Sequence, residues 1–311
     1  MALNKFGSFH DFCRDSTLPV CNLFPGFNYA DPSGFEDGCY LTGISLTNGQ
    51  YLGNLGMKNH AIKNYVDITG SIIIASIAIV IATLLILLSE RKQAAVGRRE
   101  VQIFLFIYAL IEICEIFTVG LFPLDNTVLI AFTSAHLGLI VASLWTLMLN
   151  AVVGYQLLDD GTPLSVGLIA TSALLFFLGT GYIALDTAFS WTGRFESSLS
   201  GENSNMGLYV LYQLAPIIFL TMFFILESYL VLRVLGEWKP MIYLVSASLL
   251  FIIGQVFNYV ASIHICNATS GKINGALFET FFTLLSVIAV WIFWSSITED
   301  DWPTTPNNPY P

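Results

Sequence analysis

Charged residues are scarce in this chain. They make up 11% of its 311 residues, and hydrophobic residues make up 55%, whereas about a quarter of the residues in a typical soluble domain are charged. The 12 Lys and Arg residues form no basic stripe, and the 22 Asp and Glu residues leave a net charge of −10. A nucleic-acid partner is therefore not expected, because binding to phosphates requires clustered positive charge.

The chain also lacks the residue sets that carry catalysis or cofactors inside membranes. Of its 4 histidines, only His136 falls in an apolar run, and a zinc hydrolase needs about three metal ligands with an open position for water. No lysine lies deep in an apolar run, which excludes a retinal-type Schiff base. Gly-rich phosphate loops are absent as well. We expect no catalytic residue, no metal and no cofactor, and we expect that the protein is not an enzyme.

Long apolar runs are abundant. Seven stretches are long enough to cross a bilayer, at residues 66–88, 101–122, 127–149, 163–185, 207–235, 241–263 and 273–297, since a transmembrane helix needs roughly 20 residues. One soluble domain cannot cover so many helices that are apolar on all sides. The sequence therefore predicts an all-α fold, with an N-terminal segment at 1–65, a seven-span transmembrane bundle at 66–297 and a disordered tail at 298–311.

The distribution of lysine and arginine predicts the orientation of the bundle. The loop after the first span carries Arg91, Lys92, Arg98 and Arg99, and the loop after the second carries none. Such residues are enriched in cytoplasmic loops, so we expect a cytosolic C-terminus and a lumenal or extracellular N-terminus. No cleavable signal peptide precedes the first span, which should itself act as the insertion signal. The candidate glycosylation site at Asn267 also lies on the predicted lumenal side.

The positions of the cysteines agree with this topology. Cys114 lies in the second span, and the other four of the 5 cysteines fall on the predicted lumenal side: Cys13, Cys21, Cys39 and Cys266. An even number of cysteines in an oxidising compartment predicts disulfides. Three pairings are possible, and we favour Cys13 with Cys21 and Cys39 with Cys266, because the first pair closes a short local loop.

Two local patterns stand out in the N-terminal segment. Phe6, Phe9 and Phe12 recur at helical spacing, which predicts a short amphipathic helix lying against the membrane face or the other loops. Further on, apolar and polar residues alternate around Asn48 and Gly49, the favoured dipeptide of a tight hairpin turn. The segment is too short to bury a large core alone, so we expect it to pack on the bundle.

Ionisable side chains within the spans are the best pointers to function. They are Glu112 and Glu115 in the second span, His136 in the third, Glu227 in the fifth and Glu279 in the seventh. Each costs about 2.5 kcal/mol or more in hydrocarbon unless it faces protein or water. Glu112 and Glu115 are three residues apart and share one helix face. The two carboxyl groups could form a proton relay or a cation site, or they could be hydrogen-bonded glue between helices. We favour glue, because no basic residue lies deep in any span to complete a coupling pair.

Three stretches together resemble one family of fungal membrane proteins. They are "FGSFHDFCRDSTLPVC" at the N-terminus, "GLYVLYQLAPIIFLTMFFILESYLVLRVLGEWKP" through the fifth span and "ALFETFFTLLSVIAVWIFWSSITEDDWP" across the seventh. The chain is similar to the chitin synthase export chaperones over nearly its whole length.

This resemblance implies a membrane protein of the endoplasmic reticulum. Such a protein binds a newly made chitin synthase, prevents its aggregation and allows its export to the cell surface for cell-wall synthesis. The implied partners are chitin synthase, membrane lipids and the coat or cargo-sorting machinery. No retrieval signal ends the chain, which would permit the protein to accompany its client to the plasma membrane.

The fifth span contains two candidate contacts with the client. The first is a polar strip within the membrane, made of Tyr212, Gln213, Glu227 and Tyr229. The second is a cytosolic contact in the turn "RVLGEWKP", made of Arg233, Glu237, Trp238 and Lys239. Glu227 could equally form a hydrogen bond with a neighbouring helix of the same bundle. Pro216 should kink this span and free a carbonyl group.

Two other classes of function share the predicted topology. A small-molecule transporter would use Glu112, Glu115 and Glu279 as coupling sites. A receptor or lipid sensor would also have seven spans, but the short cytosolic loops offer little surface for a signalling partner. Proton-linked uptake into vesicles would favour the transporter, and co-purification with a chitin synthase would favour the chaperone.

Overall fold

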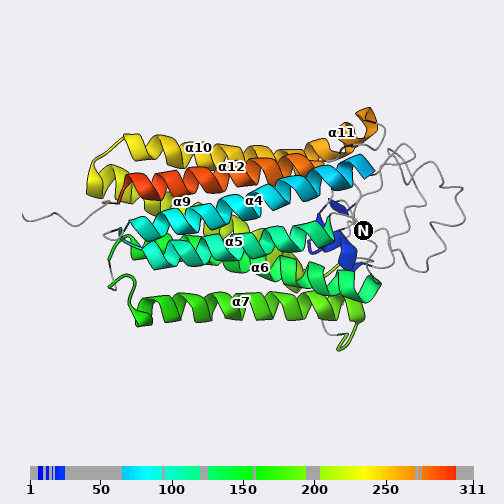
Figure 1. Cartoon of the computed structure of the whole chain (residues 1–311). Helices are drawn as coiled ribbons and strands as arrows, with labels where there is room; N and C mark the ends of the chain where they lie inside the picture. Colours follow the sequence, from blue (N-terminus) through cyan, green and yellow to red (C-terminus); the bar gives the residue numbers. More distant parts are fainter. Residues whose placement is uncertain are drawn as a thin grey trace, which may run out of the picture.

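The computed structural model describes residues 6–9, 12, 13, 16, 18–24, 65–92, 95–119, 125–156, 159–193, 204–269, 273 and 275–298. Within these residues the regular structure is helical (Figure 1). The elements are η1 (Pro19–Leu23), α4 (Tyr65–Arg91), α5 (Arg98–Thr118), α6 (Asn126–Val153), α7 (Pro163–Phe189), α8 (Met206–Tyr209), η2 (Val210–Leu214), α9 (Ala215–Tyr229), η3 (Leu230–Leu235), α10 (Lys239–Val256), η4 (Phe257–Ala261), α11 (Ser262–Ala268) and α12 (Gly275–Ser296).

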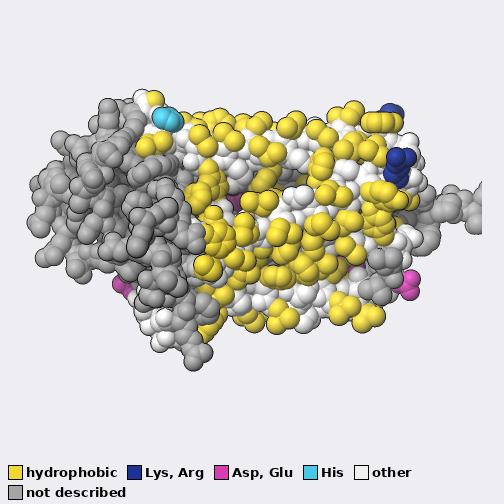
Figure 2. All heavy atoms as spheres, turned by 180° about the vertical axis from the view of Figure 1, so that it is seen from behind, with side chains coloured by type: hydrophobic (Ala, Val, Ile, Leu, Met, Phe, Trp, Pro, Cys, Tyr) yellow, Lys and Arg dark blue, Asp and Glu magenta, His cyan; other side chains and the backbone are white. Residues whose placement is uncertain are grey.

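Seven helical segments are long and apolar enough to cross a membrane, which confirms the predicted fold. They span Gly70–Arg91, Arg98–Thr118, Thr127–Val153, Pro163–Phe189, Met206–Leu235, Lys239–Ile265 and Gly275–Ser296. The fifth is continuous through α8, η2, α9 and η3, and the sixth runs through α10, η4 and part of α11. Hydrophobic side chains cover the middle of the bundle, and Lys and Arg side chains lie at one end of it (Figure 2).

The helices follow one another around the bundle. Helix α5 packs between α4 and α6, α7 packs on the outer side of α6, and α12 packs against both α4 and α10 (Figure 1). Helix α9 packs mainly on α6 and contacts α10 only sparsely. The bundle is therefore less tightly closed between α9 and α10 than between its other neighbouring helices.

The fifth span is irregular next to its proline. Pro216 lacks a backbone N–H and cannot complete the regular hydrogen bond to the residue one turn earlier. The turn before it, η2, is a π-helix, a distortion that often marks functional sites. The kink and the freed carbonyl group expected at Pro216 stay predictions. The span ends at Gly236, whose φ of 69° lies in the left-handed region that favours glycine.

The loops at the α6–α7 end of the bundle are held by buried acceptors. One oxygen of Glu100, at the start of α5, accepts hydrogen bonds from the backbone N–H of Gly161 at 3.0 Å and from the hydroxyl of Ser165 at 2.8 Å. Asp160 accepts a hydrogen bond from the N–H of Gly97 at 2.9 Å. The connections α4–α5 and α6–α7 are thereby fastened to each other.

The described part of the N-terminal segment packs on the opposite end of the bundle. Phe9 is fully buried, and its ring contacts Tyr209 at the start of the fifth span. Asn22 donates hydrogen bonds to the carbonyl of Thr118, the last residue of α5, and to the hydroxyl of Thr133, in the first half of α6. The prediction that the segment packs on the bundle is confirmed for these residues. We call the end of the bundle on which they pack the η1 end.

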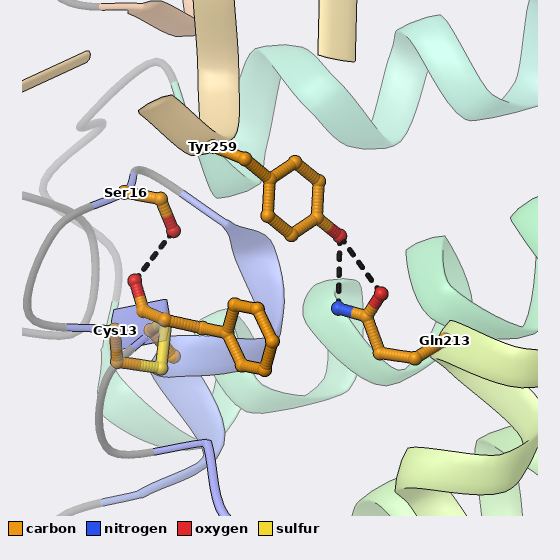
Figure 3. The surroundings of a disulfide bond; sticks show 6 residues. Cys13, Ser16, Gln213 and Tyr259 are labelled. Atoms are coloured by element: carbon orange, nitrogen blue, oxygen red, sulfur yellow. Dashed lines mark hydrogen bonds between the residues drawn. A yellow bond between two sulfur atoms is a disulfide. The ribbon is translucent and has the colours of Figure 1, made fainter. Parts of the chain in front are cut away.

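A disulfide joins Cys13 to Cys21, with an S–S distance of 2.05 Å (Figure 3). It closes the loop that leads into η1, and this is the first of the two pairs expected from the sequence. Cys39, the hairpin expected at Asn48 and Gly49, and most of the C-terminal tail lie outside the described residues. So do the side chains of Cys266 and Asn267.

Candidate functional site: a polar cavity between the fifth and sixth spans

A cavity of ≈ 760 Å³ lies inside the bundle where α9 and α10 diverge. Its back wall comes from α5, α6 and α12, and η1 lies at one end of it. It brings together most of the intramembrane polar residues singled out from the sequence: Glu112, Glu115, His136, Tyr212, Gln213 and Glu279. In Figure 2 an acidic side chain is visible within a hollow of the apolar surface.

Glu115 of α5 and His136 of α6 form a polar pair at the η1 end. His136 Nε2 lies 3.4 Å from Glu115 Oε2, and His136 Nδ1 lies 3.0 Å from Thr118 Oγ1. The Thr118 hydroxyl also lies 2.9 Å from the carbonyl of Cys114; when it donates its single proton to that carbonyl, His136 Nδ1 is the donor to Thr118. With that proton alone, the pair of Glu115 and His136 carries one negative charge. A second proton, on Nε2 of His136 or on the carboxyl group of Glu115, makes the pair neutral.

Amide groups join the fifth span to the sixth, through η2 and η4, and the sixth to the seventh, through α10 and α12. Gln213 Nε2 donates to the Tyr259 hydroxyl at 2.8 Å, and that hydroxyl donates back to Gln213 Oε1 at 3.2 Å (Figure 3). Glu279 Oε1 accepts from Gln255 Nε2 at 3.2 Å and from Thr283 Oγ1 at 3.1 Å. The bonds between Gln213 and Tyr259 and between Gln255 and Glu279 cross between spans, whereas the bond from Thr283 lies within α12. Part of the polar group therefore acts as the glue that we favoured from the sequence.

Glu112 differs from the other acids in the cavity. Its side chain is 3% exposed, and its Oε2 atom has no hydrogen-bond partner among the described residues. Glu115, three residues later on the same helix face, is paired with His136. The carboxyl group of Glu112 interacts with the hydroxyl of Tyr108, four residues earlier on the same helix. Its Oε2 atom is still a buried acceptor without a hydrogen-bond partner among the described residues, and such an atom is costly.

The charge of the cavity has one sign. No lysine or arginine is among the described residues that line it, whereas three glutamates are. Within the described residues, no three His, Cys, Asp or Glu side chains converge closely enough to hold a metal ion. The site is suited to accepting hydrogen bonds or to holding protons, and an anion that entered it would meet no cationic side chain on the described lining.

Glu227 faces a second, smaller cavity of ≈ 160 Å³ at the end opposite η1. It is 6% exposed, and its Oε2 atom has no hydrogen-bond partner among the described residues. Phe104, Leu147, Phe223 and Val290 line both cavities and so stand between them.

The four residues of the predicted polar strip on the fifth span do not share one face, and their contact with a client stays a prediction. Tyr212 and Gln213 line the large cavity and Glu227 the small one, while Tyr229 is 57% exposed on the outer surface. The reason is helical geometry, because residues two apart, such as Glu227 and Tyr229, point to nearly opposite sides of a helix. The turn that follows is exposed throughout, including Arg233, Glu237, Trp238 and Lys239, as a contact surface requires.

Sequence reasoning missed several residues of the site. Tyr108, Thr283 and Tyr259 line the large cavity, and Tyr259 is the hydrogen-bond partner of Gln213. Tyr108 precedes Glu112 by four residues, so helical spacing could have placed both on one face. Tyr259 and Thr283 carry no such signal, because an apolar span does not reveal which of its sides faces the bundle.

These features define a class: a seven-span helical membrane protein with a buried, acidic cavity between its fifth and sixth spans. Residues 5–308 match the family described as Chitin synthase export chaperone. The chain belongs to this family. It is a family of chaperones, and the protein is not an enzyme.

Curated relatives from several fungi carry the same description. The chitin synthase export chaperone of Coccidioides immitis is 31% identical over 298 residues, which cover 96% of this chain and 84% of the relative. That of Fusarium oxysporum is 30% identical over 301 residues, covering 96% and 84%. That of Neurospora crassa is 28% identical over 302 residues, covering 96% and 78%. The similarity thus extends over the whole bundle.

Proposed function

We propose that this protein binds a chitin synthase in the membrane of the endoplasmic reticulum, keeps its spans from aggregating and allows its export to the cell surface. The observation that carries the proposal is the family match over residues 5–308. A client with many spans exposes polar groups and unfilled grooves in lipid before its own helices have assembled, and each unsatisfied group is costly there. A stable, preformed bundle can cover such surfaces without a catalytic centre.

The turn between the fifth and sixth spans is our proposed contact with the client. Trp238 is 75% exposed there, and it is flanked by the exposed Glu237 and Lys239. Tryptophan is enriched among the residues that dominate binding energy at interfaces, and charges around it favour specificity. The turn therefore offers an apolar anchor inside a polar rim.

Two features at opposite ends of the bundle support a lumenal N-terminus. The disulfide between Cys13 and Cys21 lies at the η1 end, and such bonds persist in oxidising compartments. Arg91, Arg98 and Arg99 lie at the opposite end, where α4 ends and α5 begins, and basic residues favour the cytosol. Both observations lead to the same orientation.

The experiment that tests the proposal follows the client in living cells. We expect deletion of this protein to retain a fluorescently tagged chitin synthase in the reticulum, and re-expression to return it to the cell surface. An unrelated multi-span surface protein serves as the control and should travel normally. If the tagged synthase reaches the surface at its usual level in the deletion strain, the protein is not its export chaperone.

A further inference from the structure

We propose that the large cavity is a binding site for one membrane lipid whose head group donates hydrogen bonds and carries no negative charge. The lipid would enter from the bilayer between α9 and α10, with its head among the glutamates and its chain along the deeper part of the cavity. This inference rests on the cavity itself and does not depend on the proposed chaperone function.

The rim of the cavity faces the bilayer. Ile217 and Thr221 on α9 and Ile252 on α10 line it, and all three are exposed on the outer surface of the bundle. Helices α9 and α10 contact each other only sparsely, so their apolar side chains form a lateral entrance. A molecule already dissolved in the bilayer can reach the cavity without crossing water.

The polar groups of the cavity lie towards the η1 end. Glu115 is three residues from the end of α5, and Glu279 is four residues from the start of α12. Both helices meet the η1 end there. The head group of a lipid in the adjacent leaflet lies at the same end of the membrane, so a bound lipid would keep the orientation that it has in the bilayer.

The opposite part of the cavity is apolar. Its lining there comes from Phe104, Leu147, Leu220, Phe223, Phe224 and Val290. The lining of the fifth span runs from Tyr212 to Phe224, which is about 18 Å of helix at 1.5 Å per residue. This length is slightly more than half of a hydrocarbon core about 30 Å thick, as a lipid of one leaflet requires.

The unused acceptor on Glu112 sets the chemistry of the head group. Its Oε2 atom is buried and faces the cavity without a partner among the described residues, so the complementary group is a hydroxyl or an amine. Glu115 and Glu279 lie in the same cavity, whose described lining contains no lysine or arginine. A phosphate or carboxylate head group would therefore be buried without a counter-charge, whereas an amino alcohol or another uncharged or cationic head group would be accepted.

The aqueous side of the cavity is covered by the disulfide-closed loop. Leu18 and Pro19 from this loop line the cavity, and Asn22 holds η1 to α5 and α6. Figure 3 shows the disulfide beside the pair of Gln213 and Tyr259, and the ring of Phe12 contacts Tyr259 with ring centres 5.9 Å apart. The loop shields the head-group region from water and strengthens the hydrogen bonds made there.

The test uses the full chain in lipid nanodiscs and two photoactivatable probes of equal chain length, a long-chain amino alcohol and a fatty acid. We expect the amino alcohol to label peptides of α9 and α10 that line the cavity. The fatty acid should label them about tenfold less, a ratio that corresponds to the loss of one charge-assisted hydrogen bond. Equal labelling by the two probes, or labelling only outside the cavity, would overturn the proposal.

A matched pair of variants on α10 supplies the second readout. Ser248 lines the cavity and Ser246 does not, yet each hydroxyl donates to the carbonyl four residues earlier. Ser248→Phe should abolish labelling by the amino alcohol, and Ser246→Phe should leave it unchanged. Equal labelling of the two variants would contradict the proposal.

Competition on the unmodified protein covers the case in which Ser248→Phe does not fold. Unlabelled amino alcohol should displace the probe, and unlabelled fatty acid of equal length should not. Displacement by neither would overturn the lipid site. If the probes do not bind but Ser248→Phe lowers co-purification of the synthase, the cavity receives a client helix instead, and the lipid proposal fails while the chaperone proposal stands.

Discussion

His136 Nε2 lies 3.4 Å from Glu115 Oε2, inside the membrane-spanning part of the bundle. The other ring nitrogen of His136 is 3.0 Å from the hydroxyl of Thr118, so the imidazole bridges the two polar groups that α5 presents to α6. His136 is 2% exposed. The histidine is thus part of the structure that shapes the cavity wall.

We expect His136→Ala to destabilise the protein. The substitution leaves the carboxyl group of Glu115 without its nitrogen partner, and a lost partner of a buried polar group costs about 1–3 kcal/mol. His264→Ala is the control, because His264 is exposed. Thermal unfolding in detergent measures both variants. Equal unfolding temperatures would show that the contact between His136 and Glu115 contributes nothing.

Cys13 and Cys21 should be protected from alkylation until a reductant is added. Mass spectrometry of the intact, non-reduced protein checks this directly. Replacing both by serine should lower stability by about 2–3 kcal/mol, because the short loop that they close regains its freedom in the unfolded chain. Cys114→Ser is the comparison, since Cys114 is a free, buried cysteine. Reactive thiols at both positions in the untreated protein would rule out the disulfide.

Gly138→Ala should disturb the packing of α6 on α7. A Cβ atom at this position would lie 2.7 Å from the carbonyl oxygen of Phe177, and an overpacked contact costs roughly 1–3 kcal/mol. Gly179→Ala, on α7, is the matched control, because a Cβ atom there meets nothing within 4 Å. That variant should be neutral or more stable. A similar loss of stability in both variants would contradict the close approach at Gly138.

Trp238→Ala should weaken co-purification of the chitin synthase without changing the unfolding temperature. Trp238 is exposed in the turn between the fifth and sixth spans, and removal of a central interface tryptophan costs about 2 kcal/mol or more. Trp191→Ala is the control, because Trp191 is also exposed, at 59%, but follows the end of α7. An equal loss of synthase binding in both variants would count against the turn as the contact.

Glu227→Gln tests the corrected view of the fifth span. The side chain is buried against the small cavity and does not reach the outer surface, so we expect unchanged recovery of the synthase. The measurement is the same co-purification, with Trp238→Ala alongside as the variant that should bind less. Loss of the client in a stably folded Glu227→Gln protein would restore a role for this acid in recognition.

The sequence by itself determined the number and approximate limits of the spans, the family, and a favoured pairing of Cys13 with Cys21. The spans and the cysteine pair are local features of the sequence, and the family is identified from the sequence of the whole chain. A run of apolar residues forms a spanning helix wherever it packs, because lipid forces every backbone group to form its hydrogen bond within the helix. A short loop between two cysteines likewise requires no knowledge of distant contacts.

The packing of the helices sets which polar side chains meet, and the sequence did not predict it. That packing paired Glu115 with His136, gathered Glu112 and Glu279 in one cavity, and separated Glu227 from Tyr212. The physical reason is that a spanning helix is apolar on all sides, since lipid tails are as apolar as leucine. Its sequence therefore carries almost no record of the face that it turns to its neighbours, and that face is set by how the helices pack.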